Sequence, residues 1–584
     1  MAEQILKQSL SSPGFFGLNL QSADEYSDFR FAKEATNVVF DASGRIAARK
    51  GWTPISASFG NVSEAGASEY NIAEYNVAEY GAVNPIKFVY EFIKEGDNII
   101  VSGVANKFYT GTTSPTELFV RNTNNDANLV YSITNTNWQA ASLPYGESAD
   151  IEPHAYFVQE GHQPLVLHQL PIDPTTAGSA VQAEYNIGEY NIAEYGIATS
   201  VFDPHSHDSN VFGLQRLGDI GTLPLGYTIT DFKPNCALAA FGRVWMADVD
   251  GDRQTIYFSR LLDGSDFQGG DSGFIALNSV FPSYDRIVAL GAHNGFLVVF
   301  GTNNIAIYSN PIDVTRLELQ DYIPNVGCAA RDSIQNTGTD IIFLSNTGVV
   351  SLQRLILEKS LPFRELSKNI RDSVIAATLA EPESGIKSVY SEADGFYLLS
   401  FTSQQKLFCF DTKIPLEDGS ARVTEWNNIQ VYSFTVTQTK ELFIGTNQYI
   451  AKYQGYLDNN EPYVLKYYTN YTNLNEPNNI KILKKVGYTY RGQDTKDFVT
   501  AWGFDYTEDF TKQTKSVPGG LVYEYNIAEY GVAEYGGGDT RNGQFTVNTS
   551  GAGNVVQVGL EATISGNYLA LQKIDIYAKQ GKVI

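Results

Sequence analysis

The stretch DRIVALGAHNGFLVVFGTNNIAIYSN (Asp285–Asn310), together with IPNVGCAARDSIQNTGTDIIFLSNTGVVSLQR (Ile323–Arg354), shows the pattern that decides the fold. In each part a short apolar run meets an Asn/Gly turn, and a second β-rich run follows the turn. The two turns are Gly301–Asn304 and Ser345–Gly348. Runs this short and this rich in β-branched residues favour strands over helices, and two of them around a polar turn predict a β-hairpin.

The same unit recurs at seven places along the chain. Successive units start 45 to 56 residues apart, except for one gap of 88 residues that contains an insertion. Repeats of this length made of strands and turns are typical of β-propeller blades, which stack around a common axis because one blade cannot bury both of its faces alone. The chain is therefore predicted to be all-β, with a β-propeller of about six to eight blades. The units start at Asn98, His154, Gly242, Gly295, Asp340, Gly395 and Lys440.

The strand pattern also predicts how the chain is divided into domains. Residues 1–36 are predicted to form an extended N-terminal arm and residues 37–456 the propeller, in which the hairpin Asn37–Trp52 either completes the last blade or starts the first. After Tyr456 the strands lengthen, so residues 457–584 are predicted to be a separate antiparallel, sandwich-like β-domain. A string of sandwiches is the alternative for the propeller region, but its modules would usually be separated by linkers, and the sequence shows none between Asn84 and Tyr456.

Three near-copies of one Tyr-rich segment interrupt this pattern: EYNIAEYNVAEYGAV from Glu69, EYNIGEYNIAEYGIA from Glu184 and EYNIAEYGVAEYGGG from Glu524. Their period of five fits neither a helix nor a strand, so we expect arms outside the core, inserted at 63–83, 180–200 and 522–538. Tyr gives a large contact area at low entropic cost, which suits binding to a neighbouring subunit or another protein; surface decoration without function is the alternative. The partner-binding candidates are Tyr70, Tyr75, Tyr80, Tyr185, Tyr190, Tyr195, Tyr525, Tyr530 and Tyr535.

Composition restricts the possible partners. The formal net charge of −24 argues against tight nucleic-acid binding, because that affinity comes from Lys and Arg at phosphates. Such a charge serves solubility or lines a passage to which nucleic acid must not adhere. The N-terminus shows no signal-peptide pattern, and no apolar run is long enough for a membrane span, so no membrane anchor is expected. The three cysteines, Cys236, Cys328 and Cys409, lie far apart without a CxxC pair, which argues against a zinc site; two of them stand in apolar strand contexts and are interpreted as small buried residues.

Few residues in the sequence suggest metal binding or catalysis. His205 and His207 form a His-x-His in a polar stretch, and Asp248, Asp250 and Asp252 surround a turn that resembles the start of a calcium loop. A polar loop and a polar hairpin turn explain both more simply, so metal binding there is the less favoured alternative and no cofactor is predicted. No GxSxG, P-loop or HExxH motif occurs, and we expect no enzymatic activity.

A local basic cluster stands out in this acidic chain. It consists of Lys481, Lys484, Lys485 and Arg491. A solvated strand edge, where lysines block aggregation, is the favoured interpretation, and docking of an acidic partner is the alternative.

Several strands resemble the tail nozzle, or packaged-DNA stabilisation, proteins of short-tailed bacteriophages. The resemblance covers Asn235 to Trp426 well and the rest loosely, and the end of the chain, VQVGLEATISGNYLALQKIDIYAKQGK, is similar to the end of related tail proteins. The Tyr-rich insertions depart from the family pattern. The residues that carry the resemblance are Trp245, Phe258-Ser259, Leu297 to Phe300, Gly327-Cys328 and Phe343-Leu344-Ser345.

The resemblance implies a structural virion protein, assembled in the host cytoplasm, in the phage tail below the portal or adaptor ring. It implies a homo-hexamer that prolongs the DNA channel, retains the packaged genome and conducts it during ejection, with tail fibres or other tail proteins as neighbours. Double-stranded DNA would pass through without tight binding. Two alternatives remain: a carbohydrate-active, sialidase- or depolymerase-like propeller, which needs two carboxylates about 5 to 10 Å apart, and a monomeric propeller used as a binding scaffold.

Overall fold

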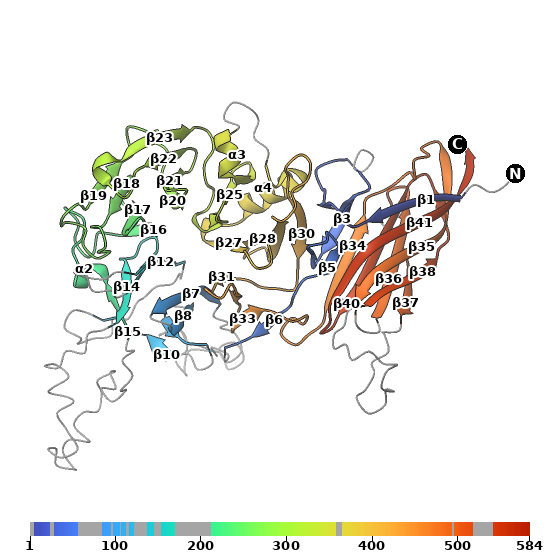
Figure 1. The fold of residues 1–584 in the computed structure, drawn as a ribbon, viewed down its shortest axis with the longest axis horizontal. Helices are drawn as coiled ribbons and strands as arrows, with labels where there is room; N and C mark the ends of the chain where they lie inside the picture. The colour runs from blue at the N-terminus through green and yellow to red at the C-terminus, as the bar shows by residue number, and fades with distance from the viewer. Residues whose placement is uncertain are drawn as a thin grey trace, which may run out of the picture.

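The computed structural model describes residues 5–23, 28–56, 85–94, 97–104, 107–112, 116–118, 120–121, 137–144, 153–169, 212–357, 365–492, 496–507, 509–517 and 541–583. These residues form two parts that lie side by side, a ring of small sheets and a β-sandwich (Figure 1). The predicted all-β class and the β-propeller are confirmed.

Six separate sheets are blades of the propeller, and each is named here by its first strand. The β7 blade contains β7 (Ile86–Lys94), β8 (Asp97–Val104), β9 (Lys107–Thr110) and β10 (Thr116–Leu118). The β12 blade contains β12 (Gln139–Leu143), β13 (His154–Val158), β14 (Leu165–Gln169), β15 (Phe212–Arg216) and β11 (Val120–Arg121). The β16 blade contains β16 (Pro234–Ala240), β17 (Arg243–Val249), β18 (Asp252–Phe258) and β19 (Gly273–Ala276).

The other three separate blades follow the same plan. The β20 blade contains β20 (Ile287–His293), β21 (Phe296–Gly301), β22 (Ile305–Ser309) and β23 (Glu318–Ile323). The β24 blade contains β24 (Gln335–Asn336), β25 (Ile341–Ser345) and β26 (Gly348–Ser351). The β31 blade contains β31 (Ser433–Val436), β32 (Leu442–Gly445), β33 (Ile450–Tyr453) and β6 (Trp52–Pro54).

The ring position between the β24 and β31 blades is filled by part of a larger sheet. It consists of β27 (Ile386–Ser391), β28 (Phe396–Phe401), β29 (Lys406–Asp411) and β30 (Arg422–Trp426). The first strands of neighbouring sheets contact each other all the way round, from β7 through β12, β16, β20, β24, β27 and β31 back to β7. These first strands therefore form the inner circle of the ring.

All seven predicted hairpins are present, each as the second and third strand of its unit in the ring, for example β21–β22 and β25–β26. The turn between β20 and β21 lies outside these hairpins, and its sequence explains its conformation. His293 pairs with Phe296 across Asn294 and Gly295, whose φ angles are 49° and 81°. Two central residues with positive φ make a turn whose twist matches that of the strands, and Asn-Gly adopts it readily.

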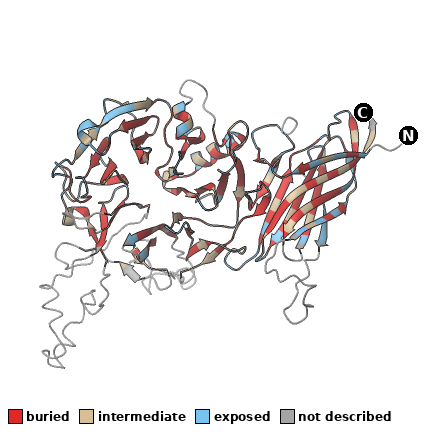
Figure 2. Ribbon diagram, viewed as in Figure 1, coloured by how far each residue is buried: buried red, intermediate tan, exposed pale blue. Residues whose placement is uncertain are grey.

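The blades are held together by separate apolar clusters between neighbours, and most strand residues that face them are buried (Figure 2). Between the β20 and β24 blades, for example, the rings of Phe300 and Phe343 meet with centroids 4.9 Å apart. A blade loses one face of its core when a neighbour is removed, so closure of the ring stabilises every blade.

Short helices connect the strands at several places. They are α2 (Leu217–Ile220), η2 (Val314–Arg316), η3 (Arg331–Ser333), α3 (Leu352–Leu357), η4 (Lys368–Ile370), α4 (Arg371–Ala380) and η5 (Glu383–Gly385).

The sandwich is built from both ends of the chain. One sheet contains β1 (Ile5–Ser11), β4 (Val38–Phe40), β5 (Ile46–Ala48), β35 (Asn479–Gly492), β38 (Arg541–Asn548), β39 (Ala552–Gly553) and β41 (Leu569–Val583). The other contains β2 (Gly17–Leu18), β3 (Phe31–Thr36), β34 (Tyr463–Thr469), β36 (Lys496–Phe504), β37 (Thr511–Val517) and β40 (Val556–Ile564). Aromatic rings meet between the two sheets; the centroids of Phe498 and Phe545 are 4.6 Å apart.

Two boundary predictions are wrong. Residues 1–36 are not an extended arm, because β1 pairs with β41 and β3 pairs with β34 inside the sandwich. The hairpin predicted within 37–456 also belongs to the sandwich, since β4 pairs with β5 and β5 with β41. The ring is closed instead by the next strand, β6, which pairs with β33. Period-two patterning shows that a strand exists but not which distant strand it joins.

The expected separation of residues 457–584 is also incomplete. One ten-stranded sheet runs from β27–β30 in the ring, through β3, into β34, β40, β36 and β37 of the sandwich. Asn37, buried with φ 57°, connects the parts: its backbone N–H donates to Glu425 at 2.9 Å and its side-chain oxygen accepts from Asn427 at 3.0 Å. The two parts are therefore covalently and structurally continuous.

Candidate functional site

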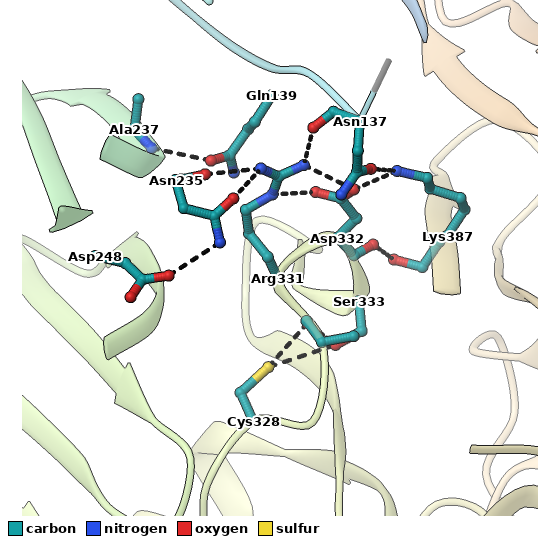
Figure 3. Close-up of polar contacts among 12 residues, drawn as sticks. Asn137, Gln139, Asn235, Ala237, Asp248, Cys328, Arg331, Asp332, Ser333 and Lys387 are labelled. Atoms are coloured by element: carbon teal, nitrogen blue, oxygen red, sulfur yellow. Dashed lines mark hydrogen bonds and ion pairs between the residues drawn. The ribbon is translucent and has the colours of Figure 1, made fainter. Parts of the chain in front are cut away.

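A buried polar cluster joins four units of the ring near its inner circle (Figure 3). Its centre is η3, which precedes the β24 blade and contacts both β20 and β27. Arg331 and Asp332 come from η3, Asn137 lies just before β12, Asn235 lies in β16 and Lys387 in β27. Residues up to 250 positions apart in the sequence therefore meet here.

Arg331 uses all five of its N–H groups inside the protein. Its Nε and Nη2 atoms each donate a hydrogen bond to one of the two Asp332 carboxylate oxygens, at 2.7 and 3.0 Å. Nη1 donates to the backbone and side-chain oxygens of Asn235 at 2.7 and 3.0 Å, and Nη2 also donates to the Asn137 carbonyl at 2.8 Å. The planar guanidinium suits such multiple recognition. No donor of Arg331 is left for a ligand.

Asp332 and Lys387 form the second ion pair of the cluster, and the Lys387 ammonium also donates to Asn137 Oδ1. Burial alone would raise the pKa of Asp332, but Arg331 and Lys387 hold it well below its usual range. Burial lowers the pKa of Lys387, and Asp332 opposes that shift. Both cations thus lie beside the Asp332 carboxylate, and such pairing is the arrangement that makes buried ions tolerable.

The turn after β17 extends this cluster. Asp248 accepts a hydrogen bond from Asn235 at 2.9 Å and pairs with Arg253 at 3.0 Å, while Asp250 lies 3.3 Å from Arg253. Asp252 instead accepts from Tyr257 at 2.7 Å. Asp248 and Asp250 thus share Arg253, while Asp252 bonds to a tyrosine. The described residues contain no group of three or more His, Cys, Asp or Glu arranged to hold a metal.

The nine candidate tyrosines, and His205 and His207, lie outside the described residues. The described residues on either side of each Tyr-rich segment can, however, be located. Ser56 and Ile86, before and after the first segment, both bond to the turn between β32 and β33. Gln169 and Phe212, around the second, are paired strand neighbours. The third joins β37 to β38, which contact each other. Each segment thus leaves and re-enters at neighbouring places.

The predicted basic cluster on β35 is split, and β35 is not an edge strand, because it lies between β38 and β41. Lys481 is buried on the inner face, and burial lowers its pKa. Lys484 and Lys485 are both exposed, because a register shift between Leu483 and Lys485 breaks the alternation of faces.

The cysteines are all buried and reduced. Burial raises the pKa of the Cys328 thiol to about 12, and its sulfur lies 3.1 Å from the Ala330 carbonyl oxygen. The interpretation of the cysteines as small buried residues is confirmed.

Sequence reasoning missed the cluster around Arg331. The one available signal was Lys387, a cation inside the otherwise uncharged run IKSVYS of β27. A single such residue is weak, because a lysine on an exposed strand position looks the same in sequence.

Charge is divided unevenly between the two parts of the molecule. Residues 57–456, which hold most of the ring and the first two Tyr-rich segments, contain 23 Lys and Arg against 45 Asp and Glu. Residues 1–56 and 457–584 together contain 18 Lys and Arg against 20 Asp and Glu. Nearly all the net negative charge therefore belongs to the ring and its insertions.

No known protein family and no curated protein matches the chain. Among solved structures, it is similar to the extracellular domain of a one-component system from B. thetaiotaomicron, with 11% identity and a TM-score of 0.35 over 70% of this chain and 40% of that one. It is also similar to the Neurospora crassa Pan2 WD40 domain, with 7% identity and a TM-score of 0.33 over 70% of this chain and 98% of that one. The chain thus spans well under half the length of the first structure. TM-scores this low give no basis for assigning the function of these structures to this chain.

No described helix has the length and apolar character that a membrane span requires.

Proposed function

We propose that this chain is a structural subunit of a phage tail nozzle. Six copies form a ring that prolongs the DNA channel below the portal or adaptor ring, retains the packaged genome and conducts it during ejection. The proposal extends the strand resemblance described above, whose residues, such as Trp245 and Phe343, are buried core residues of the blades.

The observation that carries the proposal is the charge division. A ring region with 45 acidic and 23 basic residues presents a strongly negative body, and a wall of like charge repels phosphate, so that DNA slides without adhering. The Arg331 cluster adds a second point. It occupies the inner circle of the propeller with bonded side chains, so the DNA passage lies between copies of the chain and not along the axis of one propeller.

The same cluster weighs against the carbohydrate-active alternative. Three carboxylates in or near the cluster have a cation beside them: Asp332 has Arg331 and Lys387, Asp248 has Arg253, and Glu383 of η5 has Arg286. Carboxylates in such pairs are poorly suited to act as a general acid or a free nucleophile.

The test is the assembly state of the purified full-length chain. Sedimentation velocity and negative-stain imaging are expected to show rings with a central hole and the mass of six copies. A second measurement titrates duplex DNA at about 150 mM salt, where the isolated chain is expected to bind no more tightly than the micromolar range. A chain that stays monomeric at every concentration, or that binds DNA at nanomolar concentration with a steep salt dependence, overturns the proposal.

A further inference from the structure

We infer that the outer face of the seven-stranded sheet is the surface on which each subunit docks against the acidic propeller of a second copy. The inference rests on the proposed ring and adds the contact that builds it. The basic face, as this surface is called here, consists of Lys7, Lys484, Lys485, Arg491, Lys573 and Lys579, with Asp575 and Tyr577 among them.

Cross-strand register places these residues on one face. Lys7 of β1 and Lys485 of β35 are both direct partners of Tyr577 on β41, one on each side. Their ammonium groups lie 5.3 and 4.5 Å from the centre of the Tyr577 ring. Thr489 and Ser11 flank Lys573 in the same way. Directly opposite residues share a face, so three strands present one continuous cationic surface.

The strands that build this face supply few acidic residues of their own. The strands β1, β35, β38 and β41 contain a single carboxylate, Asp575. Asp575 lies 2.9 Å from Lys573 and 3.5 Å from Lys7, and it also accepts a hydrogen bond from Ser9. The side chains of Lys7 and Lys573 remain 45% and 34% exposed, and Lys484 and Lys485 are exposed as well.

The register shift at Leu483 strengthens this interpretation. In a regular strand neighbouring residues point to opposite faces, so one of Lys484 and Lys485 would point into the sandwich, where its charge would be buried. The shift turns Lys484 and Lys485 outward together, although Lys481 on the same strand is buried. The strand thus gives up regular pairing at the place where two cations become available.

The partner that fits is a second copy of this chain, because the complementary charge is already in the molecule. The ring region and its first two insertions carry an excess of 22 acidic residues, and the basic face belongs to the other part. A basic surface on one part and an acidic surface on another make a head-to-tail contact, and repeated head-to-tail contacts close into a ring when the rotation fits. Electrostatic complementarity of this kind sets orientation and association rate.

The experiment reverses the charge of the basic face and leaves the rest of the chain unchanged. The variant Lys7→Glu/Lys485→Glu/Lys573→Glu is compared with Lys512→Glu/Lys515→Glu, a control on β37, a strand of the other sheet. Circular dichroism and melting confirm folding of both. Sedimentation velocity at 150 mM NaCl is expected to show the control in rings and the face variant with assembly weakened at least tenfold. If the triple variant does not fold, the double variant Lys485→Glu/Lys573→Glu replaces it.

A contact map gives an independent readout on the wild-type chain. Zero-length carbodiimide cross-linking of a mixture of ¹⁵N-labelled and unlabelled copies is expected to join Lys485 or Lys573 of one copy to Asp or Glu within 85–456 of another. Two results overturn the inference: rings of the face variant as stable as the control, or DNA binding that the wild type shows and the face variant loses while its rings persist. A wild-type chain that never forms rings refutes the nozzle proposal itself, which is a different result.

Discussion

Single buried residues, above all Arg331, bond distant parts of the ring to one another. Burial of two cysteines could be predicted, because Cys236 and Cys409 stand in apolar strands. The role of Arg331 could not, because a charged residue after a turn looks solvated in sequence. Its partners Asn137 and Asn235 lie 194 and 96 positions away, and only the closed ring brings them together.

Replacing Arg331 tests this role. Arg331→Met leaves the buried Asp332 with one of its two cations, and the expected loss is about 3 to 5 kcal/mol of unfolding free energy. Chemical denaturation followed by tryptophan fluorescence measures it. The matched control is Arg316→Met, whose side chain is 80% exposed and pairs with Asp313, and whose expected effect is within about 0.5 kcal/mol. Equal stability of the two variants would contradict the assignment.

A second residue-scale prediction concerns acid. Burial, with a smaller contribution from His168, lowers the pKa of His154 to about 4. The unfolded chain binds this proton near the ordinary histidine pKa of about 6.5. Stability from neutral His154 is thus full above that value and is lost as the pH falls toward 4, by roughly 2 to 3 kcal/mol in all. His154→Gln is expected to have a shallower fall in melting temperature between pH 6.5 and 4. A wild-type slope in that variant would show that other groups cause the fall.

At the scale of elements, the hairpins were predictable because each is local: two apolar runs and a turn specify it without reference to the rest of the chain. The partners of β1, β3 and β6 were not, since each pairs with a strand more than 390 residues away. The Tyr-rich segments were recognised by their period alone. The described residues on either side of each segment are neighbours, but the expectation that the core does not need the segments stays a prediction, as does their partner role.

Deleting the segments tests that role. Removal of Glu69–Tyr80, Glu184–Tyr195 and Glu524–Tyr535, singly and together, shortens loops whose ends already lie close. Loop closure depends weakly on length, so the expected change in stability is about 1 kcal/mol or less. Under the proposed nozzle function, assembly or attachment to tail proteins is expected to fail. Deletion of Thr123–Thr134, twelve residues without the repeat, is the control. Unfolding of the monomers would place the segments in the core, and intact assembly would make them decoration.

At the scale of the molecule, the continuous ten-stranded sheet makes the ring and the sandwich one unit. Arg49, fully buried between them, pairs with Asp458 at 2.6 Å, donates to Asn37 at 3.0 Å and lies over the ring of Tyr463. Calorimetry of the wild type is therefore expected to show one cooperative transition. Arg49→Met removes the ion pair and is expected to divide it into two. Two well-separated transitions in the wild type would show that the parts unfold independently.

The pairing of β1 with β41 has a consequence for synthesis. Ile5 lies opposite Lys579, so the start of β1 waits for a partner that is synthesised more than 570 residues after it. β6 likewise waits for β33, so the propeller cannot close until the chain has passed Tyr453. Throughout translation both early strands present unpaired edges, which are prone to non-native pairing. The growing chain is therefore vulnerable until these partners have been made, and chaperone contact with residues 5–54 is expected to end when β41 is complete.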